Sequence, residues 1–66
     1  MNNKWVLKNI DPDSFYRNKY LAKSGSKNSY TGSIKLMRKF DSIEEAINSS
    51  CVDSEIPIPL IDLLGI

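Results

Sequence analysis

Two adjacent carboxylates, Glu44 and Glu45, are the side chains of this sequence that come closest to a catalytic pair. Paired carboxylates act as general acid and base in glycoside hydrolysis, where they face each other across the bond that breaks. Neighbouring residues of a helix point in different directions, so these two cannot face one substrate together. The chain has no His to serve as a base and no nucleophile beside a recognisable base. The sequence therefore predicts a protein that is not an enzyme.

Cysteine and histidine usage narrows the chemistry further. With Cys51 alone and no His, a disulfide framework and a Cys/His zinc site are excluded within one chain, and no cofactor is predicted. Cys51 is expected to be a small, semi-buried apolar residue. The first ten residues lack a long apolar core with a cleavage signal, and no apolar run approaches the length that spans a bilayer. We therefore expect a reducing, cytoplasmic location and no membrane partner.

Basic residues alternate with aromatic ones in KWVLK, FYRNKY and KNSY, a combination suited to phosphates and stacked bases. Trp5 and Tyr20 fall in predicted strands, where the core is their expected place. Tyr16, Arg17 and Tyr30 fall in predicted loops and are candidates for contact with a partner.

The charges are divided along the chain. Residues 1–40 carry nine basic and two acidic side chains, a net charge of +7, whereas residues 41–66 carry six acidic and no basic ones, a net charge of −6. Such a division indicates a basic face for nucleic acid or an acidic partner, or head-to-tail self-association. The alternative is that the two parts neutralise each other within one fold. Lys19, Lys23 and Lys27 are the lysines that we expect on the basic face.

The elements that must position these residues can be predicted from periodicity. Apolar and aromatic residues alternate with Lys over residues 4–10 and 19–23, which is typical of strands. The connection starts with the turn-forming Asp11 and Pro12, and a polar Gly/Ser/Asn-rich loop follows the second strand. Residues 33–38 are spaced ambiguously between helix and strand, and we favour a short helical turn.

The segment FDSIEEA, residues 40–46, predicts a helix start. Asp41 is placed to cap the helix, Glu44 can reach back in a capping box, and Glu45 adds a negative charge near the positive end of the helix dipole. Ile43, Ala46, Ile47 and Cys51 then share one face at helical spacing. We expect a helix over residues 42–50.

The last part of the chain, IPIPLIDLLGI, predicts an edge strand over residues 56–61. Pro57 and Pro59 lack the N–H groups that would point toward one side of that strand, so it can pair only along its other side. Residues 62–66 are then an apolar tail. Its side chains Leu63, Leu64 and Ile66 exceed what a small core can use and are candidate anchors for a partner, or for a second copy in a homodimer.

These elements predict a single α+β domain over residues 1–66, with a small antiparallel sheet of about three strands and one short helix packed on one face. The predicted core consists of Trp5, Leu7, Leu21, Phe40, Ile43, Ile47 and Ile58.

Two resemblances bear on function. The segments KWVLKN, NKYLAK and YTGSIKLMRKFDSIEEA, within residues 4–47, resemble small accessory proteins of phages and prophages, a class that includes inhibitors of host defence such as anti-CRISPR proteins. This resemblance implies a non-enzymatic protein that binds and inhibits a host protein, such as a defence nuclease or a signalling component. LIDLL, residues 60–64, resembles the bacterial sliding-clamp-binding motif, with Leu60 where that motif has Gln. A nucleic-acid-associated module and a sliding-clamp-binding protein are the alternative functions.

Overall fold

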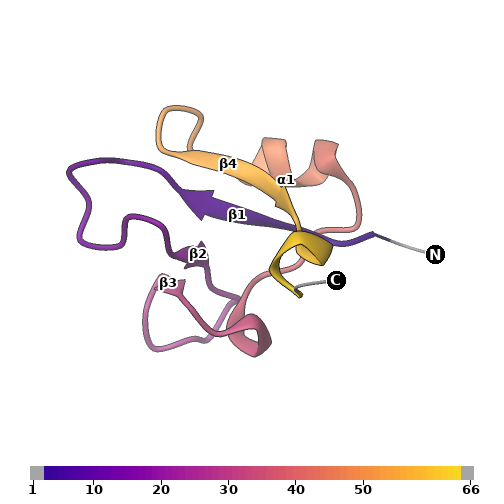
Figure 1. Ribbon diagram of the computed structural model, residues 1–66, viewed down its shortest axis with the longest axis horizontal. Coiled ribbons are helices and arrows are strands. Elements are labelled where there is room, and N and C mark those ends of the chain that lie inside the picture. The colour runs from indigo at the N-terminus through magenta and orange to yellow at the C-terminus, as the bar shows by residue number, and fades with distance from the viewer. Residues whose placement is uncertain (1–2, 65–66) are drawn as a thin grey trace.

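A four-stranded antiparallel sheet with one α-helix forms the framework of the protein (Figure 1). The computed structural model describes residues 3–64. The strands are β1 (Trp5–Asn9), β2 (Tyr20–Leu21), β3 (Tyr30–Thr31) and β4 (Glu55–Pro59), in the order β3-β2-β1-β4. The predicted α+β class is confirmed. The two-residue strand β3 lies in a stretch expected to be loop, because its sequence is dominated by turn-forming residues on either side.

Strand β4 is an edge strand whose outer side lacks donors. Trp5 pairs with Pro59 and Asn9 with Glu55 across β1 and β4. The Leu60 amide donates to the Lys4 carbonyl at 2.9 Å, so the backbone N–H and C=O groups of the even-numbered residues of this strand point toward β1. Pro57 and Pro59 consequently turn their nitrogens to the open edge, as predicted, and no N–H group is lost from the ladder. The strand ends at Pro59, two residues earlier than expected.

Helix α1 (Ile43–Ser49) starts one residue later than predicted. Ser42 is the N-cap, because its hydroxyl accepts from the Glu45 amide at 3.1 Å, and Glu45 in turn accepts from the Asp41 amide at 3.4 Å. Asp41 pairs with Lys4, so the prediction that Asp41 caps the helix with Glu44 was wrong. The reason lies in β1: Trp5 and Phe40 exchange backbone hydrogen bonds of 2.9 and 2.8 Å, which hold residue 40 extended and bring the Asp41 carboxylate toward Lys4.

The main core lies between the sheet and α1. Leu7, Phe40 and Ala46 are buried there, with Trp5 and Leu21 packed against them. Ala46 was not in the predicted core. Its small side chain is the buried position of the helix, whereas Ile47, one residue and about 100° further round, is 48% exposed. The prediction of Ile47 in the core was therefore wrong.

Residues that pair across an antiparallel sheet share a face, so Val6 and Ile58 lie on the face opposite Leu7. Val6 is fully buried and Ile58 partly buried, so both faces of the sheet are covered near β1. Met37 is also buried and, like Val6, was missing from the predicted core. Ile43 is partly buried.

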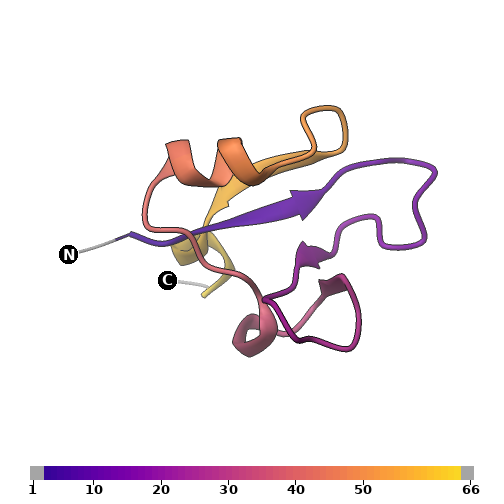
Figure 2. The same ribbon diagram turned by 180° about the vertical axis from the view of Figure 1, so that it is seen from behind.

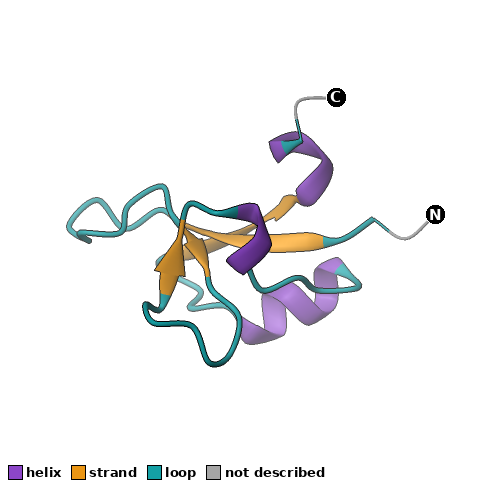
Figure 3. Cartoon of the chain, turned by 90° about the horizontal axis from the view of Figure 1, so that it is seen from below, coloured by secondary structure: helices purple, strands orange, loops and turns teal. Residues whose placement is uncertain are grey.

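Two short 3-10 helices complete the fold: η1 (Ile34–Leu36) and η2 (Leu60–Leu63). The first confirms the predicted helical turn. Lys39 braces it, since the ammonium donates to the carbonyls of Ile34 at 2.6 Å and Met37 at 3.2 Å. The second, η2, follows β4 directly, and Figure 3 shows it on the opposite face of the sheet from α1. Among residues 3–64, no helix has the length and apolar character needed to cross a membrane.

Candidate protein-binding surface

The basic and acidic parts of the sequence lie on opposite sides of β1 in the folded chain. Strand β1 lies between β2 and β4 in the sheet, so β2, β3 and η1 extend to one side of it and β4 and α1 to the other. Figure 2 shows the same separation from behind, with the segment from β2 to η1 below β1 and the segment from α1 to β4 above it. Residues 14–40 carry no acidic side chain, whereas residues 41–64 carry no basic one. The two sides of the sheet therefore differ in the sign of their charge.

Seven basic side chains follow Ser14, all are exposed, and none pairs with a carboxylate among residues 3–64, where the one ion pair is Lys4–Asp41. We call them the basic set: Arg17, Lys19, Lys23, Lys27, Lys35, Arg38 and Lys39. Arg38 lies over the ring of Phe40, with 5.2 Å between the guanidinium carbon and the ring centroid, a cation–π contact that leaves its charge unneutralised. Among residues 3–64, direct ion pairing between the two halves is therefore confined to one pair at the boundary between them.

The loop of residues 11–18, which joins β1 to β2, is held by the buried Asn9. Its side-chain oxygen accepts from the Asp11 amide at 2.9 Å, and its side-chain nitrogen donates to the Ser14 hydroxyl at 3.2 Å. Its backbone carbonyl accepts from the Asn18 amide at 2.8 Å. Asn18 has φ of 69°, a left-handed conformation that Asn tolerates better than most residues. The side chain of Asn9 thus fixes the first part of the loop, and its backbone carbonyl fixes the end.

Three aromatic rings follow one another across this loop and β3. Phe15 meets Tyr16 edge to face, with centroids 5.3 Å apart, and Tyr16 stacks on Tyr30 at 5.6 Å. Tyr16 and Tyr30 are partly buried, but Phe15 is 93% exposed. Tyr16 and Tyr30 were predicted from the sequence to contact a partner, whereas Phe15 was not. Its position in a loop between two turn signals, outside any apolar period, was the signal that could have pointed to exposure.

Tyr30 also belongs to a polar cluster with Glu55 and the Cys51 amide, which we call the Glu55 cluster. Its hydroxyl donates to Glu55, whose other carboxylate oxygen accepts from the Cys51 amide at 2.8 Å. Glu55 is 4% exposed, so the structure buries a carboxylate and supplies both of its oxygens with donors. Burial, together with the hydrogen bond to Glu55 and the charge of that residue, raises the pKa of Tyr30 to about 12. Cys51 itself is exposed, which corrects the expectation that it is semi-buried.

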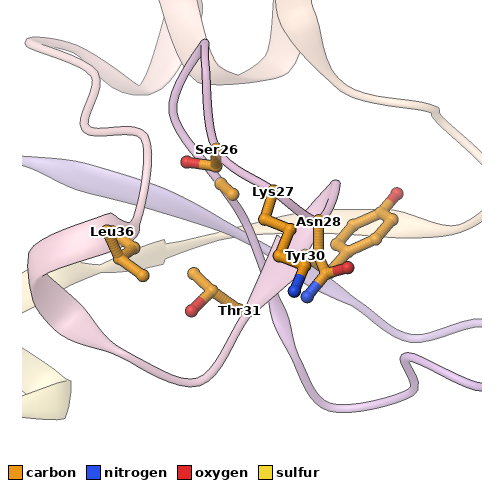
Figure 4. Close-up of a pocket in the computed structure, with 7 residues that line it drawn as sticks. Ser26, Lys27, Asn28, Tyr30, Thr31 and Leu36 are labelled. Atoms are coloured by element: carbon orange, nitrogen blue, oxygen red, sulfur yellow. The ribbon is translucent and has the colours of Figure 1, made fainter.

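A small pocket lies between the β2–β3 loop and η1, with Ser26, Lys27, Thr31 and Leu36 around it (Figure 4). Its volume is about 70 Å³. Pockets for small-molecule ligands usually measure about 300–1,000 Å³, so this one has room for a few water molecules. The Ser26 hydroxyl is buried there without a protein partner, which suits an ordered water. Among residues 3–64, no group of three His, Cys, Asp or Glu side chains could hold a metal ion.

The structure separates the predicted partner-binding residues into two groups. Tyr16, Arg17, Lys19, Lys23, Lys27 and Tyr30 all belong to β2, β3 or the loops beside them. Leu63 lies in η2 and Leu64 directly after it, at the end of the molecule opposite the 11–18 loop in Figures 1 and 2. Leu63 is partly buried and Leu64 is half exposed. Ile66 lies outside the described residues.

Residues 60–64, which resemble the sliding-clamp-binding motif, form η2 and its end. Leu60 and Leu63 are partly buried, whereas Ile61 and Leu64 are exposed. A partner that takes up all four apolar side chains would therefore have to open this turn.

Comparisons with protein-family models, with curated proteins and with solved structures find no match to this chain.

Proposed function

We propose that this is a non-enzymatic phage-encoded protein that acts in the cytoplasm of the host cell. It binds a host protein, such as a defence nuclease or a signalling component, and inhibits it by covering part of its surface. The observation that carries this proposal is the one-sided exposure of the basic set, seven cations without a carboxylate partner within residues 3–64. The resemblance of residues 4–47 to small phage accessory proteins supports the biological setting.

A surface of this kind favours an acidic partner. Unpaired cations on one side of a small protein raise the local potential, which speeds diffusional encounter with a negatively charged surface. The acidic side of the same molecule carries the exposed Glu44 and Glu45 of α1 and Asp53 in the turn before β4. These charges repel a negatively charged surface, so the two sides together orient the approach. Orientation before contact is an advantage for an inhibitor that must find one protein among many.

The proposal is tested by affinity purification from host lysate, followed by assay of the captured protein with and without the purified chain. We expect activity to fall in proportion to the chain added and to reach its minimum at a fixed stoichiometry. A captured protein that remains fully active with saturating chain would contradict the inhibitory role.

Charge reversal tests the surface. The triple variant Lys19→Glu, Lys23→Glu, Lys27→Glu should associate more slowly and respond less to ionic strength, because steering depends on these charges. The matched control changes the same three residues to Arg, which keeps the charge and should keep the association rate. Equal association rates for the reversed and control variants would show that these three lysines do not steer the chain to its partner.

The same surface also suits a nucleic-acid-associated module, since Lys and Arg neutralise phosphates. If nuclease treatment of the lysate abolishes capture of the host protein, that alternative is favoured.

The apolar residues near the chain end provide a further distinction. If deletion of residues 62–66 abolishes partner binding while the oligomeric state is unchanged, the tail is a partner anchor. If it converts a dimer to a monomer, the tail closes a homodimer.

A further inference from the structure

Phe15 is exposed to an extent that packing within the chain does not explain. Large aromatic side chains contribute most of their free energy by leaving water, and this ring is 93% exposed at the surface. Its single aromatic neighbour, Tyr16, meets it at right angles. With 93% of its surface exposed, the Phe15 ring is open to a partner.

The loop that presents Phe15 is fixed before any partner arrives. Besides the bonds from Asn9, the Ser14 amide donates to the Asp11 carbonyl at 3.1 Å, and the Tyr16 amide donates to the Ser14 hydroxyl at 3.0 Å. These bonds lie on both sides of Phe15 in the sequence. A loop backbone held in this way needs little further ordering when its side chain binds, which lowers the entropic cost of forming an interface.

The support for Phe15 reaches across the sheet. Tyr16 stacks on Tyr30 of β3, and Tyr30 donates to Glu55 of β4. Contacts with the two edge strands, β3 and β4, therefore support the position of Phe15 in addition to the bonds within its own loop. The nearest charges along the chain are Asp13 on one side and Arg17 and Lys19 on the other.

We propose that Phe15 is the anchor by which this chain docks on a partner protein, inserting its ring into an apolar pocket whose rim carries carboxylates to face Arg17 and Lys19. This inference rests on the proposed function and adds to it the side chain and the kind of pocket. Anchors of this kind, a buried aromatic surrounded by polar contacts, supply most of the affinity of many interfaces.

Two other occupants fit less well. A nucleic acid that stacked a base on Phe15 would carry its regularly spaced phosphates past Asp11 and Asp13 as well as past Arg17, whereas carboxylates on a pocket rim can lie on the Arg17 side alone. A second copy that docked through its own basic side would bring the two basic sets together, and like charges repel. The pocket on that side, of about 70 Å³, is also smaller than the roughly 150 Å³ of a cavity that holds a benzene ring.

The test places a photo-crosslinking benzophenone amino acid at position 15 of the full chain, expressed in phage-susceptible host cells. The matched control carries it at position 52, where Val52 is also apolar and 81% exposed but lies in the turn before β4. We expect position 15 alone to give an adduct with one host protein. Mass spectrometry of the crosslinked peptide should place the site in an apolar segment flanked by Asp or Glu.

Several outcomes would overturn the inference: an adduct that nuclease removes, an adduct of twice the mass of the chain, the same adduct from both positions, or none. With the crosslinked protein purified, Phe15→Ala should weaken binding about 30-fold, the range of an interface hot spot, mainly through faster dissociation. Val52→Ala should change it little. Both substitutions remove exposed side chains, so melting temperatures should stay near that of the wild type.

The anchor and the inhibitory function can fail separately. An adduct from position 15 with a protein whose activity the chain does not change would leave the anchor in place and refute the inhibition. Full inhibition by Phe15→Ala, with unchanged affinity, would keep the inhibitory function and refute the anchor.

Discussion

Tyr30→Phe removes one hydroxyl and should destabilise the fold more than its size suggests. That hydroxyl donates to the carboxylate of Glu55, which is 4% exposed and has its other oxygen on the Cys51 amide. Without the hydroxyl, a buried charged oxygen loses its donor. A hydrogen bond to a charged group contributes roughly 1.5–3 kcal/mol, and we expect a loss of about 2 kcal/mol.

The expected loss is large on the scale of this protein. For 66 residues, the free energy of unfolding should be about 3–10 kcal/mol. A loss of about 2 kcal/mol should lower the melting temperature by about 8–16 °C in a domain of this size. The assay is thermal unfolding followed by circular dichroism at neutral pH, with urea unfolding to obtain the free energy directly.

The matched control is Tyr20→Phe, which removes the hydroxyl of another partly buried tyrosine, in β2, that lies outside the Glu55 cluster. It should change the melting temperature far less. A double-mutant cycle with Glu55→Gln then isolates the interaction, since each single substitution also changes its own surroundings. Equal destabilisation by Tyr30→Phe and Tyr20→Phe, or a coupling free energy near zero, would refute the reasoning.

Three further predictions follow from the described structure. Because the pKa of Tyr30 is raised from 10.0 to about 12, the folded state holds the phenol proton more tightly, so this stabilisation is complete below pH 10 and is lost as the pH rises through 12. An ultraviolet titration of the wild type minus that of Tyr30→Phe should therefore have its midpoint near 12. Ser42→Ala should cost about 1 kcal/mol in urea unfolding through the lost cap, and Asp41→Ala less than that, since it loses a surface ion pair. A larger loss of stability for Asp41→Ala than for Ser42→Ala would indicate that Asp41 is the N-cap. Replacing Pro57 and Pro59 by Val should add donors to the open edge of β4 and cause concentration-dependent association in sedimentation velocity. A double variant that stays monomeric at high concentration would show that the prolines are not what protects the edge.

Local patterns in the sequence were enough to predict much of the framework. Alternation over residues 4–10 predicted β1, because the side-chain period of a strand is set by its backbone alone. The prolines of IPIPL predicted the blocked edge for a similar reason: a missing N–H is a property of the residue, wherever the strand lies. The charge division was also visible in the sequence, but whether the charges would neutralise each other depended on the strand order.

Tertiary structure decided the features that depend on contacts between distant residues. Both Asp41 and Ser42 precede a Glu at capping distance, and the pairing of Trp5 with Phe40 selected Ser42. The strand β3 exists through its pairing with β2, although turn-forming residues surround it in the sequence. The Glu55 partner of Tyr30 is 25 residues away and could not be predicted locally either. Phe15 was missed for a related reason: its place between two turn signals indicated a loop, but only the packed chain shows that no other element covers the ring. Local backbone preferences act over a few residues, whereas burial is settled by the whole packed chain.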